Sequence, residues 1–333
     1  MRVLLVTEVA ISRPGGVETH LRELARGLLT LGHDVDVMGP RDALPGVHWV
    51  DAPSAAHDVV HDHSTSLARG VALDRRYVRT LHFCTRAKMD VYVRRGRLRT
   101  LANPGNWHDV IEERAAAKRP GRVVAVSARV RDDFARWHRL DPARAHVIPN
   151  GAAFASARTP RGALRARWGI PLDAPVLLTI GRQDFVKGYD LLARAWRAAS
   201  LPPHALWVTV GGARSSRHEG RLVTGPLPQP EVADWVHAAD LGALPSYYEG
   251  CSLALLEMLA GDLPVLAANV GNAAEVIRSP AHGELLAHEP ARWAEALTLR
   301  LRPRTAPRAA LLDDSFRWER IAERIAAVYA GGA

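Results

Sequence analysis

Residues 244–266 read LPSYYEGCSLALLEMLAGDLPVL, and this stretch decides how the second half of the chain folds. It follows a short apolar strand and turns tightly through Gly250. An apolar run then continues as a helix until Gly261 and Pro264 end it. Ser252 precedes that run and is a good N-cap residue. The stretch therefore predicts a strand, a turn, a helix and the next strand.

Two glutamates frame the predicted helix start. Glu249 lies just before it, and Glu257 lies inside the helix, eight residues later. A helix N-terminus offers unpaired N–H groups and the positive end of a dipole, which suits a phosphate. Eight helical residues span roughly 12 Å, about the distance from a hexose across a diphosphate to a ribose. The pair therefore fits a nucleotide sugar. The same sequence is also consistent with an alternative, in which Glu249 is exposed to solvent and Glu257 pairs with a basic residue on the surface.

The motif P-S-x-x-E-G-x-x-L-x-x-L-E in this stretch resembles the donor-site motif of retaining GT-B glycosyltransferases of family 4. The resemblance implies that Glu249 orients the sugar and Glu257 the ribose, and that the turn between them contacts the donor. The expected contacts from that turn and the helix start are Gly250, Cys251, Ser252 and Leu253. This chain has Cys-Ser where the family most often has Phe-Gly, which affects the fit of the donor sugar.

Composition indicates a folded globular chain, because 47% of its 333 residues are hydrophobic and 24% are charged. That length accommodates two domains. No run of 18 apolar residues occurs, so no membrane span is predicted. The first ten residues, interrupted by Glu8, are expected to form a strand rather than a signal peptide. Cys84 and Cys251 are the two cysteines, which fits a reducing cytosol and a cytoplasmic location.

The N-terminal sequence predicts that the chain begins as an α/β fold with a parallel sheet. A buried-type strand at 2–7 leads to Gly15 and Gly16, then to a helix ending at Gly32 and a strand at 35–38. The glycine pair lets a ligand approach the backbone, or forms a plain tight turn. It does not match G-x-G-x-x-G, so a nicotinamide site is poorly supported. The family resemblance places this loop over the donor phosphates and the acceptor.

Histidines follow two of the predicted strands. Residues 57–64 read HDVVHDHS, which could suggest a metal, but no third ligand group with metal spacing is visible. The family carries a similar D-V-V-H-x-H near the acceptor, which implies that His61 and His63 bind acceptor. His82 follows the strand at 78–81 and resembles the family's T-x-H histidine, which faces the transferred sugar. A lone histidine is otherwise more often structural. We also assign Arg86, which begins the next basic cluster, to the acceptor side.

A second phosphate signal lies at residues 181–188, GRQDFVKG, after the strand at 176–180. Arg182 and Lys187 are two cations at a strand exit, and they could neutralise a diphosphate, Arg182 bidentately and Lys187 as a point charge. The alternative is that Arg182 and Lys187 are ordinary charged residues on the surface with no ligand. The segment resembles the family's G-R-x-x-x-x-K-G, which favours the diphosphate role. Residues 222–227 resemble the segment that reads the nucleotide base, so Leu222 is assigned to the donor.

These motifs cover nearly the whole chain and predict an α/β protein of the GT-B class, with two Rossmann-like domains facing each other across a cleft. Residues 1–155 are expected to form the acceptor-binding domain, ended by the family's P-N-G at 149–151. A linker at 152–174 would lead to the nucleotide-sugar-binding domain at 170–312. The C-terminal helix, within 313–333, is expected to cross back to the first domain.

The resemblance implies retaining transfer of a sugar from a nucleoside diphosphate sugar to an acceptor hydroxyl. His82, Arg182, Lys187 and Glu249 are the expected catalytic residues, and no cofactor or essential metal is expected. A nucleotide-sugar epimerase, a phosphorylase and a non-catalytic nucleotide-binding protein share this fold. No pyridoxal lysine motif supports the phosphorylase. A glycosidase would leave the Arg/Lys pair unexplained.

The net charge of +9 is unevenly distributed. Residues 69–144 hold 19 Lys+Arg against 8 Asp+Glu, a balance of 19 − 8 = +11. Within them, Arg94, Arg95, Arg97 and Arg99 interleave with Tyr92, Val93 and Leu98. This face could meet a phosphorylated acceptor or lie at an anionic membrane on the cytoplasmic side, or it could be a solvated basic surface. Nucleic acid is disfavoured because no stacking aromatic set accompanies the charge.

Overall fold

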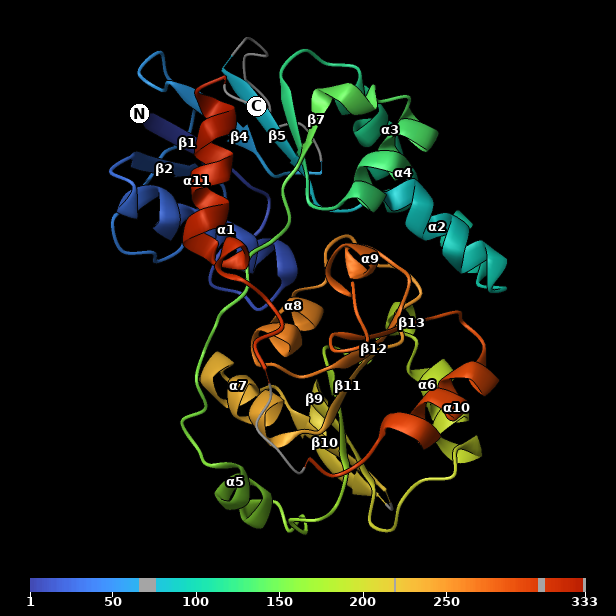
Figure 1. Ribbon diagram of the computed structural model, residues 1–333. Helices are drawn as coiled ribbons and strands as arrows, with labels where there is room; N and C mark the ends of the chain where they lie inside the picture. The colour runs from blue at the N-terminus through green and yellow to red at the C-terminus, as the bar shows by residue number, and fades with distance from the viewer. Residues whose placement is uncertain (66–75, 219, 305–308, 332–333) are drawn as a thin grey trace. The chain divides into compact units, whose positions relative to one another are not determined.

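The computed structural model of this chain describes residues 1–65, 76–218, 220–304 and 309–331. The chain divides into two compact units (Figure 1). The first contains Met1–Gly151 together with Ser315–Ala333, and the second contains Ala152–Asp314. None of the helices in the described ranges combines the length and apolar character needed to cross a bilayer.

The first unit is built on a seven-stranded sheet in the order β3-β2-β1-β4-β5-β6-β7, with every pairing parallel. The strand β1 lies in the interior of the sheet, between β2 and β4, and its last four side chains, all valine or leucine, are buried. Such continuous apolar runs are typical of parallel strands that are covered on both faces. The strands are β1 Arg2–Val6, β2 Asp34–Met38, β3 Val47–Trp49, β4 Val59–Asp62, β5 Tyr77–Leu81, β6 Arg122–Ala125 and β7 Ala145–Val147.

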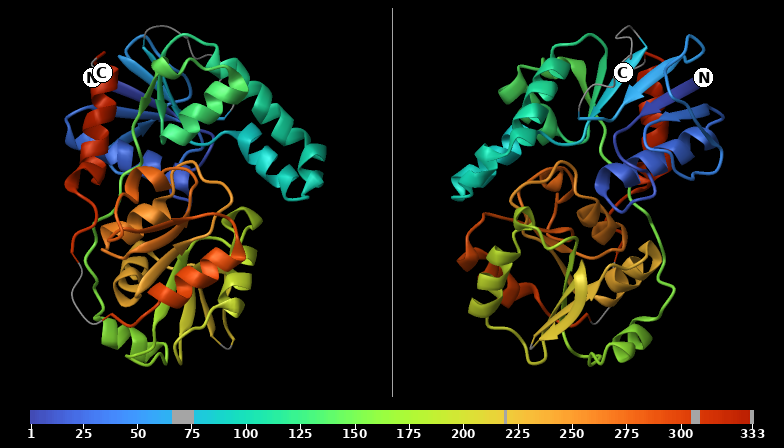
Figure 2. Two further views of the ribbon diagram at one scale, coloured as in Figure 1. Left: turned by 45° about the vertical axis from the view of Figure 1, so that its right-hand side comes forward. Right: turned by 180° about the vertical axis from the view of Figure 1, so that it is seen from behind.

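Two groups of helices accompany this sheet, and Figures 1 and 2 show α1 beside α11 and α2 beside α3. Helix α11 comes from the C-terminal segment, and it crosses α1 so closely that a Cβ at Gly27 would lie 2.5 Å from that of Ala322. The helices of the unit are α1 Gly16–Thr30, α2 Thr85–Arg94, the 3₁₀ helix η1 Leu98–Ala102, α3 Pro104–Ala117, α4 Ala128–His138, η2 Pro142–Arg144 and α11 Trp318–Tyr329.

The second unit has a six-stranded sheet in the order β10-β9-β8-β11-β12-β13. Its middle strands are again apolar and buried. The strands are β8 Val176–Ile180, β9 Leu206–His218, β10 Arg221–Gly225, β11 Leu241–Leu244, β12 Val265–Ala268 and β13 Gly283–Leu286. Its helices are α5 Arg161–Arg167, η3 Phe185–Lys187, α6 Tyr189–Ala198, α7 Gln229–Ala238, α8 Leu253–Ala260, α9 Ala273–Val276 and α10 Pro290–Arg300, and a last 3₁₀ turn, η4 Asp314–Phe316, leads into α11.

The strand β9 continues past its apolar first half, residues 206–210, as far as His218. The chain bends at Gly211 and Gly212, which have φ values of 117° and 90°. The two halves of β9 then both pair with β10, so that Leu222 stands opposite Val208 in one half and Arg217 in the other. The polar second half has no apolar alternation, so the sequence carried no strand signal there.

The expected linker at 152–174 contains helix α5, so the linker prediction was wrong over that part. Arg165 of α5 is fully buried and forms an ion pair with Asp240 at 2.8 Å. It also donates to the carbonyl oxygens of Ala238 and Ala174, at 3.0 and 2.7 Å. Because both charges are removed from water, this pair anchors α5 to the start of β11.

We expect Arg165→Ala to lower the free energy of unfolding by about 3 kcal/mol, because Asp240 loses its fully buried partner and keeps Arg161, at 2.7 Å, which is partly exposed. Arg167 lies on the exposed side of the same helix and serves as the matched control. Urea unfolding of both alanine variants measures the difference. Equal losses would show that α5 contributes through helix propensity alone.

Candidate active site

In the second unit, the loops that follow β8, β11 and β12 meet at the carboxyl edge of the sheet, where α/β proteins bind ligands. Gly188 has φ 67°, and a Cβ there would lie 2.0 Å from the carbonyl oxygen of Pro245. A Cβ at Gly271 would lie 2.9 Å from that of Glu249. The Ser252 N–H donates to Asn272 Oδ1 at 2.9 Å. Glycines thus let the three loops pack against one another.

The predicted residues Lys187 and Glu249 form an ion pair at this edge, with 2.8 Å between Lys187 Nζ and Glu249 Oε1. Ser246 donates its hydroxyl to the same carboxylate oxygen at 2.7 Å. The Tyr247 N–H donates to the Val186 carbonyl at 2.7 Å and ties the two loops together. The side chains of Lys187 and Glu249 are 25% and 11% exposed, so both are mostly buried but can still be reached by a ligand.

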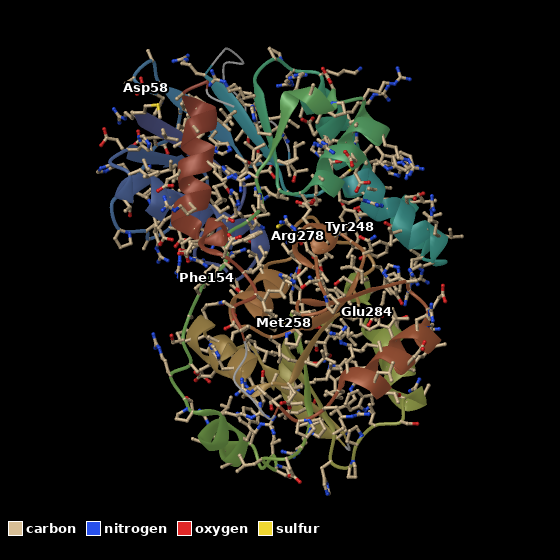
Figure 3. The ribbon with its side chains drawn as sticks, viewed as in Figure 1. Asp58, Phe154, Tyr248, Met258, Arg278 and Glu284 are labelled. Atoms are coloured by element: carbon tan, nitrogen blue, oxygen red, sulfur yellow. The ribbon has the colours of Figure 1, made fainter. Side chains whose placement is uncertain are left out.

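The helix that follows begins as predicted. Ser252 is the N-cap of α8, and its hydroxyl accepts the Leu255 N–H at 3.3 Å. Figure 3 marks Tyr248 in the loop before α8 and Met258 within it, where Met258 is fully buried. The residues from Glu249 to Ser252 are not helical, so the two glutamates do not lie on one continuous helix, and the spacing of roughly 12 Å expected from eight helical residues does not follow.

Glu257 lies on α8, away from the Lys187 pair. Its carboxylate accepts a hydrogen bond from Gln229 Nε2 at 2.7 Å. Burial raises the pKa of Glu257 to about 7, and the hydrogen bond from Gln229 limits the rise. Its protonation therefore changes near neutral pH. Together with Gln229, Glu257 lines a small pocket whose other walls include Ala153, Ala155 and His237.

The other assigned donor residues have different environments. Arg182 is 87% exposed, and its Nε lies 3.4 Å from Asp184 Oδ2. Gly250 and Cys251 lie in the loop before α8, and Leu253 is the first residue of that helix. Leu222 is 3% exposed inside β10, so the structure argues against a direct contact between its side chain and a nucleotide base.

In the first unit, a pocket opens at the carboxyl ends of β1, β4 and β5. His63 and His82 contribute to its wall, and the His63 Nδ1 lies 3.1 Å from the His82 Nε2. Burial holds the pKa of both imidazoles well below the usual value, and neighbouring His20 adds to the effect. Both rings are therefore neutral at pH 7 and can exchange hydrogen bonds with hydroxyl groups. The remaining lining residues are Thr7, Glu8, Val9, Val17, Ser64, Thr65, Arg79, Thr80, Leu81, Phe83, Glu113 and Phe134.

His61 does not take the acceptor role that we expected. It is fully buried, its Nδ1 lies 2.6 Å from the Tyr329 hydroxyl, and its Nε2 lies 2.7 Å from the Thr80 hydroxyl. Both ring nitrogens are thus occupied within the protein. The His61 ring lies next to that of His63, with the ring centroids 4.1 Å apart, but Tyr329 of α11 contacts His61, and nothing in residues 57–64 indicated that contact.

Sequence reasoning missed His20, which packs against the same cluster. Its ring centroid is 4.9 Å from that of His82 and 5.2 Å from that of His63. Its Nδ1 lies 2.8 Å from Asn150 Oδ1, and burial lowers its pKa to about 4. The signal was its place in the first helical turns after Gly15 and Gly16, on the face that carries the leucines.

Glu113 was also missed, and it supports the turn that carries His82. Both of its carboxylate oxygens accept the Thr85 N–H, at 2.8 and 3.0 Å, and the His138 Nε2 lies 2.9 Å from one of them. The start of α2 is thereby fixed to α3 and α4. Arg86, assigned to the acceptor, stacks over the Trp137 ring at 4.3 Å.

Two groups among the described residues have the ligand types that zinc prefers. They are His20, His63 and His82, and Cys84, Glu113 and His138, each with ligand atoms within 4.8 Å of one another. Burial raises the pKa of the Cys84 thiol, which disfavours the thiolate that binds metals. The absence of an essential metal stays a prediction.

Two family models match this chain. "Glycosyl transferases group 1" matches residues 174–302, and "Glycosyltransferase Family 4" matches residues 52–154. A D-inositol 3-phosphate glycosyltransferase of Streptomyces scabiei is 30% identical over 313 residues, covering 84% of this chain and 69% of that protein. The protein of that name from Xylanimonas cellulosilytica is 28% identical over 393 residues, covering 95% and 91%. The structure of Anabaena Alr3699/HepE with UDP and glucose superposes with a TM-score of 0.73 at 16% identity, covering 99% and 100%.

The two parallel-sheet units and these likenesses define a GT-B protein. The chain belongs to glycosyltransferase family 4, of the glycosyl transferases group 1, and is a glycosyltransferase. The resemblance drawn from residues 244–266 is thus confirmed.

Proposed function

We propose that this enzyme transfers a sugar, with retention at the anomeric carbon, from a nucleoside diphosphate sugar to an acceptor hydroxyl. The observation that carries the proposal is the Lys187–Glu249 pair, held at 2.8 Å beside the start of α8. A cation, a carboxylate and a helix N-terminus at one sheet edge offer complementary partners for a diphosphate and for sugar hydroxyls. The relatives named as glycosyltransferases and the neighbour with bound UDP and glucose support the donor class.

In the proposed mechanism, Lys187, Arg182 and the N–H groups at the start of α8 stabilise the charge that develops on the departing diphosphate. Glu249 accepts hydrogen bonds from the sugar, and Glu257 accepts them from the ribose. The side chains supply the positive charge, so donor binding is expected to need no metal ion. No carboxylate is assigned as a covalent nucleophile, and the leaving phosphate assists deprotonation of the acceptor on the same face.

The pocket with His63 and His82 is the proposed acceptor site. Its neutral imidazoles suit hydroxyl groups, and Glu8 offers a carboxylate at the same wall. His82 is the residue that we place against the transferred sugar. The relatives' name, D-inositol 3-phosphate glycosyltransferase, supports a polyol or sugar acceptor, with a phosphate as an optional substituent.

A screen of UDP-, GDP-, ADP- and TDP-sugars by thermal shift tests the donor, because a ligand that binds only the folded state raises the melting temperature. Products made from a stabilising donor are then analysed by NMR for the anomeric configuration, with and without a chelator. Stabilisation followed by a new nucleotide sugar in place of a glycoside would identify an epimerase. Inversion at the anomeric carbon would refute retention, and loss of donor binding with the chelator would refute metal independence.

The raised pKa of Glu257 predicts a pH dependence of donor affinity. We expect the affinity for UDP-glucose to rise up to about tenfold between about pH 6 and pH 8, because the carboxylate that accepts from the ribose forms as pH passes its pKa. The diphosphate of UDP-glucose carries no proton that titrates in this range. Calorimetry across that range measures the trend. In Glu257→Gln the slope should vanish, and the same slope in both proteins would contradict the assignment.

A further inference from the structure

The 3₁₀ helix η1 and helix α3 carry an exposed apolar surface that neither site uses. Leu98 is 61% exposed, Leu101 and Trp107 are each 41% exposed, and Ile111 is 64% exposed. These four lie within 14 consecutive residues, yet they are half of the eight large hydrophobic side chains that are exposed in the described part of the chain. We call these four, together with Arg94, Arg95, Arg97 and Arg99, the 94–111 face.

The face is ordered by hydrogen bonds within it. The Trp107 indole N–H donates to the Leu101 carbonyl at 2.8 Å, and the Asn106 amide donates to the Thr100 carbonyl at 2.9 Å. Both bonds join η1 to α3. Figures 1 and 2 show α2 extending away from the sheet of its unit. The inward residues of these helices include Ala87, Met89 and Ala116, so the unit buries a different set of apolar side chains from the four that are exposed.

The eight residues that define the face carry positive charge alone, and Asp109, between Trp107 and Ile111, is the acidic residue within their span. Residues 94–108 contain four arginines and no Asp or Glu. Arg94 pairs with Asp90 at 2.8 Å, yet its side chain remains 66% exposed. Arg97 and Arg99 are exposed beside Leu98. Basic side chains mixed with exposed Trp, Leu and Ile are typical of helices that lie in a membrane interface.

We propose that the 94–111 face docks on an anionic lipid bilayer, with Leu98, Leu101, Trp107 and Ile111 entering the headgroup region and the arginines binding lipid phosphates. Trp and Arg are also enriched at protein interfaces, so the choice of a bilayer rests on the four arginines with no acidic residue among residues 94–108, which match the phosphates of an anionic lipid surface. A nucleic acid fits less well, because Trp107 is the one exposed aromatic residue of the face. The inference goes beyond sugar transfer and does not depend on it.

Vesicle sedimentation of the full chain tests the proposal, without donor or acceptor. We expect binding to phosphatidylcholine vesicles that contain phosphatidylglycerol at low salt, and little binding to pure phosphatidylcholine. Binding should fade near about 0.5 M salt as screening shortens the reach of the charges. Each arginine near an anionic surface contributes roughly fivefold in partitioning, from about 1 kcal/mol per basic residue. Changing all four arginines to Gln should therefore lower binding by about two to three orders of magnitude.

The apolar part is tested by Leu98→Ser with Ile111→Ser, which should lower binding while preserving its salt dependence. The matched control is Leu172→Ser with Leu299→Ser, because these residues are 67% and 68% exposed elsewhere. Changing Arg26, Arg41, Arg292 and Arg320 to Gln, four exposed arginines elsewhere, controls for net charge. Circular dichroism checks that each variant is folded. Equal binding to neutral and anionic vesicles, or equal losses in the control variants, would overturn the proposal, as would RNA binding with no vesicle binding.

Discussion

Lys187→Ala is expected to lose about 10²–10³-fold in turnover, the usual cost of removing one preorganised group that stabilises charge in the transition state. Lys187 is the cation held against Glu249, at 2.8 Å, beside the start of α8. Its ammonium is therefore positioned before the donor arrives. The affinity for free UDP or GDP should fall as well, because the charge contacts the diphosphate in the ground state.

Arg182→Ala should also weaken diphosphate binding and lower turnover. Arg182 is 87% exposed, so its bidentate contact would form when the donor binds. Titration calorimetry with UDP and GDP measures affinity, and steady-state kinetics measure turnover. Arg194→Ala is the matched control, since Arg194 is an exposed cation on α6 that pairs with Asp190 at 3.3 Å. Unchanged nucleotide affinity in both Lys187→Ala and Arg182→Ala would remove the diphosphate role.

The second large effect is that substitutions at the two glutamates should change different quantities, the rate of transfer for one and the affinity for nucleotide for the other. Glu249→Gln should lower transfer by about 10²-fold and change free-nucleotide affinity much less, because its proposed partner is the sugar. Glu257→Ala should do the reverse, weakening nucleotide binding by about 10–100-fold through lost hydrogen bonds to a charged group. The structure supports separate roles, since Glu249 pairs with Lys187 and Glu257 with Gln229.

Comparison of UDP with UDP-glucose separates the two effects, because the sugar contact exists only in the second ligand. Unfolding of each variant is measured alongside, since Glu249→Gln also weakens the ion pair with Lys187. If the Glu249 variant loses as much affinity for UDP as the Glu257 variant does, the assignment of the two roles is contradicted. A Glu257 variant with normal UDP affinity and slow transfer would reverse the two roles.

Local patterns predicted most of the fold because they are strong in this chain. Apolar strands, glycine turns and a capped helix such as the one after Ser252 depend on neighbours in sequence. The same reasoning failed where long-range contacts decide. Helix α5 is held by a buried ion pair between Arg165 and Asp240, and an Ala/Arg/Pro-rich segment gives no sign of a partner 75 residues away.

The donor half of the site was easier to predict than the acceptor half. Lys187 and Glu249 lie in two short motifs, and the structure brings them together. The histidine cluster instead draws on distant parts of the chain, with His20 from α1 and Asn150 from the end of the first unit. His61 faces Tyr329, 268 positions away, so no local rule could distinguish it from His63.

The place of α11 in the first unit has a consequence for synthesis on the ribosome. Residues 152–314 form one continuous unit and can complete their sheet once they have left the exit tunnel. The first unit emerges earlier but lacks its last helix, so the packing of Gly27 against Ala322 and the bond from His61 to Tyr329 must wait. The face of α1 around Gly27 stays uncovered meanwhile and is available to a chaperone. The domain translated first is therefore the last to be completed.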